Sequence, residues 1–124
     1  MKLYKIHLVL GLAWLLAGMT LGQIMGESGD HGQLPTHAHI MLVGGVLSII
    51  WGLLYKALNL PARLIGLVQA AAHHFGVGVM IVALYGLYGG EGDPATLGPI
   101  LGIAGTAVML SVLLMLFLVV KAKD

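Results

Sequence analysis

The sequence predicts an all-α integral membrane protein, a four-helix bundle with both termini in the cytoplasm. Of its 124 residues, 59% are hydrophobic and 9% are charged, whereas roughly a quarter of the residues in a soluble domain are charged. The charged residues leave four uncharged runs, at 6–26, 31–55, 64–90 and 94–120. Each run reaches the roughly 20 residues that a helix needs to cross a bilayer. We therefore expect a single transmembrane domain over residues 1–124, with any chemistry placed among its helices.

The prolines and glycines indicate where each helix begins and ends. Helices are expected over about 4–25, 36–55, 62–89 and 96–120. The four prolines lie at or near expected helix starts, where a missing N–H costs nothing: Pro35, Pro61, Pro94 and Pro99. The first apolar run has no small-x-small cleavage site, so we expect a retained helix and not a signal peptide. The two-residue alternation of a membrane β-barrel is absent.

The distribution of charge predicts the orientation. The basic residues fall at the two ends and in the second loop: Lys2, Lys5, Lys56, Arg63, Lys121 and Lys123. The first and third loops instead carry the acidic residues Glu27, Asp30, Glu91 and Asp93. By the positive-inside bias, both termini and the second loop are cytoplasmic, and the expected location is the cell (inner) membrane, crossed several times.

Glycines recur at helical spacing in the first and fourth helices. Gly18, Gly22 and Gly26 form one ladder, and Gly98 and Gly102 begin another. Small residues at this spacing let helix backbones approach closely in lipid. The ladders therefore indicate packing within the bundle or between protomers, and the alternative is room for a flat cofactor.

Six histidines carry most of the functional information. His31 is expected to be a solvated loop residue, and His7, one turn from Lys5, to be a side chain that reaches the membrane interface. The remaining four lie within expected spans, where ionisable groups are usually functional: His37, His39, His73 and His74. Neutral imidazole is a common metal ligand, and b-type haem needs axial histidines but no cysteine. The alternative is that these histidines bond to backbone carbonyls and serve packing alone.

Helical geometry indicates which histidine of each neighbouring pair, His37 or His39 and His73 or His74, is the better candidate ligand. His37 shares a face with Gly44, Ser48 and Tyr55, whereas the aliphatic residues Val43, Val46, Ile50 and Leu53 surround His39, so His37 is expected to point into the bundle. In the third helix, His74 shares a face with Ala70, Gly78 and Tyr85 and is preferred to His73, whose face holds Gly66, Gln69 and Met80. At 1.5 Å per residue, His37 and His74 differ in height by about 12 Å. For two histidines to bind one haem, the helices would have to tilt, His39 would have to replace His37, or the second histidine would have to come from another protomer. Otherwise a single histidine holds the haem.

The motif H37-A-H-I-M-L-V-G44, followed by W-G-L-L-Y-K, resembles a segment of small four-helix membrane proteins that are grouped with the catalytic subunit of haem-copper oxidases and nitric oxide reductases. The first helix, which ends L-G-Q-I-M-G, and the H74-F75 pair extend the resemblance over three helices. It implies that His37 binds haem iron, with His74 as its expected partner. The chain departs from the family pattern at Met41, where asparagine is common, and at Gly45, where tryptophan is common.

These observations predict a membrane b-type haem protein for electron transfer or diatomic-gas sensing. The alternatives are a transport or assembly factor for copper or another transition metal, and a structural accessory subunit. A complete enzyme is not expected, because no carboxylate lies inside a span. The expected partners are the lipid bilayer, further copies of the chain, and a redox partner or quinone. The net charge of +1 without a basic cluster disfavours nucleic acid.

Overall fold

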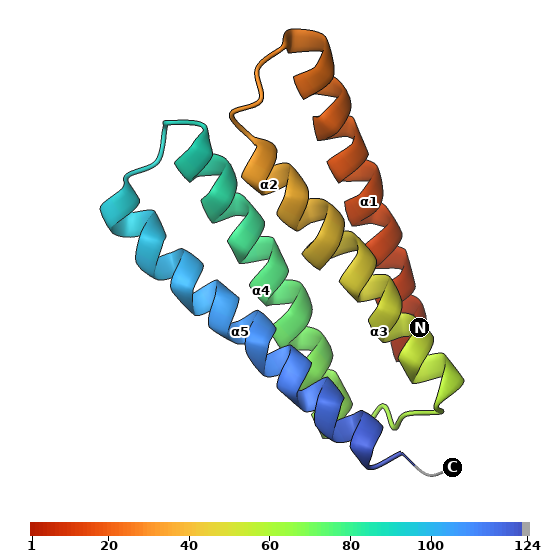
Figure 1. Ribbon diagram of the computed structural model, residues 1–124. Helices are drawn as coiled ribbons and strands as arrows, with labels where there is room; N and C mark the ends of the chain where they lie inside the picture. The colour runs from red at the N-terminus through yellow and green to blue at the C-terminus, as the bar shows by residue number, and fades with distance from the viewer. Residues whose placement is uncertain (123–124) are drawn as a thin grey trace.

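The computed structural model describes residues 1–122, which fold into helices without any strand. Four helical segments are long and apolar enough to span a membrane: Leu3–Ser28, Leu34–Ala57, Leu64–Tyr88 and Pro94–Val120. They correspond to α1 (Leu3–Ser28), the continuous series α2 (Leu34–His39), η1 (Ile40–Val46) and α3 (Leu47–Ala57), then α4 (Leu64–Tyr88) and α5 (Pro94–Val120) (Figure 1). The all-helical fold with four membrane-compatible helices is thus as predicted.

Local backbone chemistry sets the helix ends within a few residues of the expected positions. α1 continues to Ser28 and ends at Gly29, which adopts a left-handed conformation with φ 72°, an arrangement that costs glycine little. α5 begins two residues before the expected position, because the Asp93 carboxylate caps it by accepting bonds from the Ala95 amide and the Thr96 hydroxyl. The hydrogen bond from the Thr96 hydroxyl and, to a smaller extent, the one from the Ala95 amide lower the pKa of the Asp93 carboxyl.

The second span contains a π-helical segment, η1, that the sequence pattern did not predict. Gly44 and Gly45 lie in this segment and are both buried. A β-carbon at Gly44 would lie 2.9 Å from Trp14, and one at Gly45 would collide with the Leu15 side chain. The wide turn therefore coincides with a close approach of η1 to α1, directly after the two histidines of α2. Single π-helical turns inside helices are frequently found at functional sites.

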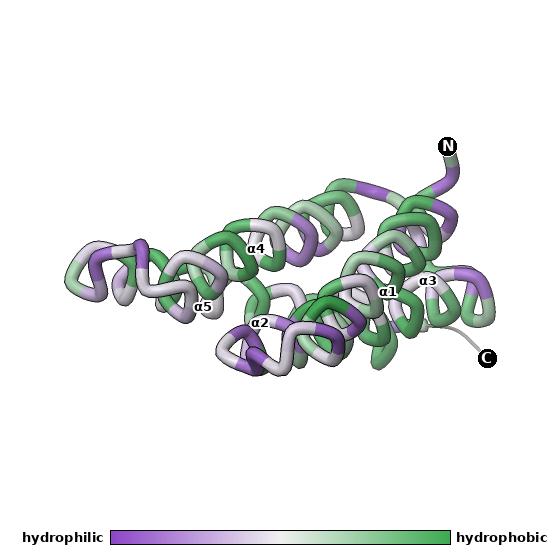
Figure 2. The backbone as a smooth tube through the Cα atoms, turned by 90° about the horizontal axis from the view of Figure 1, so that it is seen from above, coloured by the Kyte–Doolittle hydropathy of each residue, from purple (hydrophilic) through white to green (hydrophobic). Residues whose placement is uncertain are grey.

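The four spans form two helical hairpins that lie side by side (Figure 1). α1 packs along η1 and α3, and α4 packs along the full length of α5, while α4 also contacts α1, α2 and η1. Hydrophobic residues predominate along the helices and hydrophilic residues gather towards the loops and ends (Figure 2), and many of the large hydrophobic side chains are exposed. A surface that is apolar along the helices and polar at their ends is the one expected of a bundle surrounded by lipid.

The core between the hairpins has two apolar clusters. The first lies towards the N-terminal end of α1 and includes Leu3, Trp51, Tyr55 and Met115. The second surrounds Ile40, Val77, Ile81 and Ala104. The two clusters bring all four spans together.

The two glycine ladders differ in their surroundings. A β-carbon at Gly18 would lie 2.5 Å from the Met41 sulfur, and one at Gly22 would lie 2.9 Å from the His37 ring. The α1 ladder therefore serves packing inside the bundle. By contrast, Gly98 and Gly102 in α5 have nothing within 4 Å of a β-carbon position.

Candidate functional site

His73 lies at the centre of the bundle and is fully buried. It projects from α4, and its Nε2 lies 2.8 Å from Ser48 Oγ of α3. Its Nδ1 lies 3.3 Å from the Trp51 indole nitrogen of α3 and 3.4 Å from Ser111 Oγ of α5. One imidazole thus joins three of the helical segments.

These partners fix the proton position on His73. The indole N–H of Trp51 is a donor only, so His73 Nδ1 accepts from it. His73 Nε2 then carries the proton and donates to Ser48. Because Ser111 donates its own hydroxyl hydrogen to the Val108 carbonyl, its contact with His73 is secondary. Both nitrogens of His73 are therefore occupied, and the residue has no lone pair free for a metal.

His7 and His74 form a second unit beside His73. His74 Nε2 of α4 lies 2.9 Å from His7 Nδ1 of α1, so the two rings share one hydrogen bond. The centroid of the His7 ring lies 4.8 Å from that of His74 and 6.2 Å from that of His73. His7 also stacks on Tyr55, with ring centroids 5.4 Å apart and an interplanar angle of 16°.

Three polar atoms around this unit have no hydrogen-bond partner: His7 Nε2, His74 Nδ1 and Gln69 Nε2. Gln69 is fully buried, and its Oε1 accepts a 3.1 Å bond from the Tyr55 hydroxyl. The same hydroxyl lies 3.3 Å from the Gly66 carbonyl. Buried polar groups in proteins are nearly always paired. We call this set of eight side chains the histidine cluster: His7, Ser48, Trp51, Tyr55, Gln69, His73, His74 and Ser111.

His37 lies apart from the histidine cluster, in the short helix α2, and is held against α1. Its Nδ1 lies 2.8 Å from the Gly18 carbonyl. A carbonyl oxygen can only accept, so Nδ1 carries the proton and Nε2 keeps its lone pair. The absence of a side chain at Gly22 leaves space for the ring, because a β-carbon there would lie 2.9 Å from His37 Cε1.

His39 has the same proton arrangement but a more local partner. Its Nδ1 donates to the Pro35 carbonyl of its own helix, at 2.8 Å, which leaves Nε2 free. On the expected His37 face, Gly44, Ser48 and Tyr55 are buried, whereas Val46, Ile50 and Leu53 on the His39 face are exposed. Burial follows the predicted faces at these six residues, but Val43 of the His39 face is half-buried against the core, and His37 and His39 are themselves both half-buried. His31 is exposed, as expected for a loop histidine, and bonds to the Gly29 carbonyl.

The structure changes the expected grouping of the histidines. His74 hydrogen-bonds to His7, and His37 hydrogen-bonds to Gly18, so the two expected ligands are held at positions 11 residues apart on α1 and are not brought together. His73, the member of its pair given second place, is the fully buried one, with Gly66, Gln69 and Met80 buried on its face. Tyr85, on the face assigned to His74, is 57% exposed.

The expectation for His7 is wrong, because its side chain is completely buried and does not reach the interface. The sequence signal that could have placed it is the spacing of His7 from Leu3, Gly11, Gly18 and Met25, and all five residues are buried in the structure. These positions are spaced by four or seven residues and so follow one helix face. His7 therefore belongs to the same face as the glycines that contact the second span.

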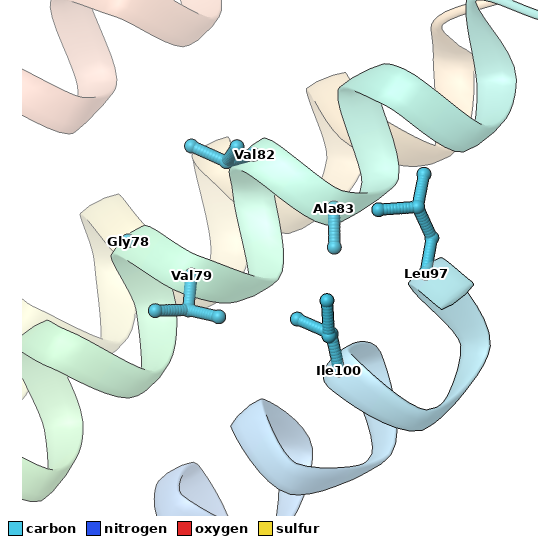
Figure 3. Close-up of a pocket in the computed structure, with 6 residues that line it drawn as sticks. All are labelled: Gly78, Val79, Val82, Ala83, Leu97 and Ile100. Atoms are coloured by element: carbon cyan, nitrogen blue, oxygen red, sulfur yellow. The ribbon is translucent and has the colours of Figure 1, made fainter. Parts of the chain in front are cut away.

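The apolar grooves of the bundle lie away from these histidines. One groove of about 280 Å³ runs between α4 and α5, where aliphatic side chains and one glycine line it (Figure 3). Another, of about 560 Å³, lies over Ile65 and the C-terminal half of α5. Neither has a ligand atom for iron. Within residues 1–122, no set of three or more histidine, aspartate or glutamate side chains is arranged to hold a metal ion.

The fold and the buried imidazoles define a membrane-compatible four-helix protein with a histidine-rich interior. No protein-family model, curated protein or solved structure matches the chain. These comparisons therefore add no support to the resemblance to haem-copper oxidase helices, and the side chains themselves are the remaining indication of function.

Proposed function

We propose that the chain is a membrane haem-binding module, with His37 as the axial ligand, that serves electron transfer or diatomic-gas sensing. The observation that supports this proposal is the proton position on His37. Its Nδ1 donates to the Gly18 carbonyl, which leaves the Nε2 lone pair for a metal. Histidines that bind metals in proteins characteristically donate the N–H of their other ring nitrogen to a carbonyl, carboxylate or water in this way.

The surroundings of His37 fit a single ligand better than a pair. His74 Nε2 is bonded to His7, and both nitrogens of His73 are occupied. His37 would then hold the iron alone from this chain, and Gly18 and Gly22 would set the ring angle. A b-type haem would supply one-electron transfer or a binding position for a diatomic gas. The apolar surface of the bundle would exclude water from such a site.

Purification in detergent with added haemin tests this function. We expect the wild-type chain to show a Soret band whose intensity follows the protein concentration, and His37→Ala to lose it. His39→Ala is the matched control, because it also removes an imidazole with a free Nε2 from the same helix.

Three results would contradict the haem proposal. Full haem content in His37→Ala together with loss in His39→Ala would transfer the ligand role to His39. A colourless wild-type chain with stoichiometric copper or zinc would favour metal transport or assembly. A chain that takes up neither would favour the reading in which the carbonyl-bonded histidines serve packing.

We also propose that both termini and the loop between α3 and α4 face the cytoplasm of a cell (inner) membrane. Lys2, Lys5, Lys56 and Arg63 lie at this end of the spans, and positive residues are retained on the cytoplasmic side. Lys123, which belongs to the same pattern, lies outside the described residues. A reporter that is active only in the cytoplasm is expected to work when it is fused after Asp124. Activity only from a reporter that functions outside the cytoplasm would reverse the orientation.

A further inference from the structure

The hydrogen-bonded pair His7 and His74 lies apart from the proposed His37 site and has no role in it. The two imidazoles come from α1 and α4, and one nitrogen of each faces the other at 2.9 Å. We propose that His7 Nδ1 and His74 Nε2 form a two-coordinate site for Cu(I), in which the metal ion takes the place of the shared hydrogen and the displaced proton moves to the unpaired His74 Nδ1, so that both imidazoles stay neutral. The proposal rests on the facing nitrogens, the uncharged surroundings and the unpaired atoms behind the two rings.

The facing nitrogens are the correct donor atoms at nearly the correct separation. Metal–imidazole bonds are about 2.0 Å long, so a linear pair needs its nitrogens about 4.0 Å apart, roughly 1 Å more than the 2.9 Å observed. His74 can supply this movement, because its side chain is only partly buried and the adjacent Phe75 is 76% exposed. His7 is fully buried and stacked on Tyr55, so it is the fixed half of the site.

The charge of the surroundings selects a monovalent ion. Among residues 1–122, the one acidic residue inside a span is Glu27, which lies in the last turn of α1. A divalent ion would therefore bring two uncompensated charges into a medium of low dielectric constant, which is costly. Neutral imidazoles with a monovalent ion leave one charge.

The number of available ligands selects copper. Structural zinc is almost always bound by four ligands, and no set of three or more histidine or carboxylate side chains is arranged for a metal within residues 1–122. His73, the nearest third imidazole, has both nitrogens occupied by Ser48 and Trp51. Imidazole is a suitable ligand for copper, and Cu(I) accepts two nitrogen donors in a line.

The unpaired Gln69 amide can fix the proton position that a metal ligand needs. Gln69 lies beside His7, and neither His7 Nε2 nor Gln69 Nε2 has a partner. A half-turn of the carboxamide would direct its oxygen towards His7 Nε2–H and let its NH₂ donate to the Tyr55 oxygen. Tyr55 would still donate to the Gly66 carbonyl. With its proton held on Nε2, His7 presents a lone pair at Nδ1. Residues that support metal-binding histidines in proteins fix the proton position in the same way.

Titration of the full-length chain with Cu(I) in detergent, under reducing conditions and against bicinchoninate as competitor, tests the site. We expect one Cu(I) per wild-type chain, and a loss of affinity of roughly 100-fold or more in His7→Ala and in His74→Ala. Gln69→Leu is expected to weaken binding by about 10- to 100-fold, the usual effect of removing a supporting residue. His31→Ala is the matched control and should bind as the wild type does. His37→Ala should also keep its Cu(I), which separates this proposal from the haem proposal.

X-ray absorption on the copper-loaded wild-type chain gives a readout that does not depend on how the variants fold. Two nitrogen neighbours and no third ligand are expected. Failure of the wild-type chain to bind Cu(I), a three- or four-coordinate spectrum, or unchanged affinity in His7→Ala would each overturn the proposal. Circular dichroism and gel filtration of each variant show whether a loss of binding reflects unfolding, in which case the absorption spectrum decides.

Discussion

His73→Leu is expected to destabilise the bundle more than the removal of any other histidine. The substitution removes the imidazole that contacts Ser48, Trp51 and Ser111 and leaves the buried Ser48 hydroxyl and Trp51 indole N–H without their partner. Hydrogen bonds between helices in a membrane contribute about 0.6 kcal/mol on average, so these contacts alone account for less than 2 kcal/mol. Unpaired buried donors raise the cost, and we expect a total loss of about 2–4 kcal/mol.

Unfolding in mixed detergent and SDS, followed by circular dichroism, measures this loss. His31→Leu is the matched control, since His31 is exposed and bonds only to a nearby backbone carbonyl. Its unfolding midpoint should equal that of the wild-type chain. A wild-type midpoint in His73→Leu would show that the central contacts of the histidine cluster do not hold the helices together.

The fold was largely predictable because the physical constraint on it is simple. A chain in lipid must satisfy its backbone hydrogen bonds internally, so long uncharged runs have few alternatives to helices. The prolines and glycines then limit the ends to within a few residues. The end of α1 shows the remaining uncertainty, because Gly26 and Gly29 both resemble helix terminators and only Gly29 adopts the left-handed conformation.

The π-helical segment η1 could not be predicted in the same way. A π turn changes which residues share a face, but it leaves no mark in a sequence whose residues are apolar on every side. Gly44 and Gly45 were visible in the sequence, yet their use depends on the approach of Trp14 and Leu15 from α1. Such a contact belongs to the packing of two helices and not to either one alone.

The histidine cluster was predicted only in part, since the sequence places residues on helix faces but does not pair the helices. His73 and His74 were recognised as candidates, whereas His7 was assigned to the interface because Lys5 is close to it in sequence. The bond between His7 and His74 joins residues 67 positions apart. Nothing in the spacing of α1 or α4 indicates that these two faces meet.

The position of the proton on each histidine ring also could not be predicted from the sequence. His37, His39 and His73 are all imidazoles in apolar helices, but carbonyl partners leave Nε2 free on the first two, whereas His73 uses both nitrogens. The sequence ranked His37 by its helix face. The structure shows that His37 Nδ1 donates to the Gly18 carbonyl. This hydrogen bond leaves Nε2 as the ring nitrogen that can bind a metal.

Gly22→Ala is expected to disturb the His37 ring while leaving the fold intact. The added β-carbon would lie 2.9 Å from His37 Cε1 and 3.4 Å from Nδ1, so the ring must move. The movement would weaken the 2.8 Å bond from His37 Nδ1 to the Gly18 carbonyl. Helix α1 itself should not suffer, because alanine is a better helix former than glycine by about 1 kcal/mol.

On the proposed haem function, this loss of orientation should lower haem affinity by about 10- to 100-fold, as the loss of a supporting contact does in metal sites. Gly26→Ala is the matched control: it lies one turn further along the same ladder and has nothing within 4 Å of the new β-carbon. Haemin titration of the two variants, followed at the Soret band, compares them directly. Equal affinity in both, alongside loss of haem in His37→Ala, would keep His37 as the ligand but remove Gly22 and the Gly18 carbonyl from its positioning. Weaker binding in Gly22→Ala alone would identify the close approach of α1 and α2 as the feature that orients the ligand.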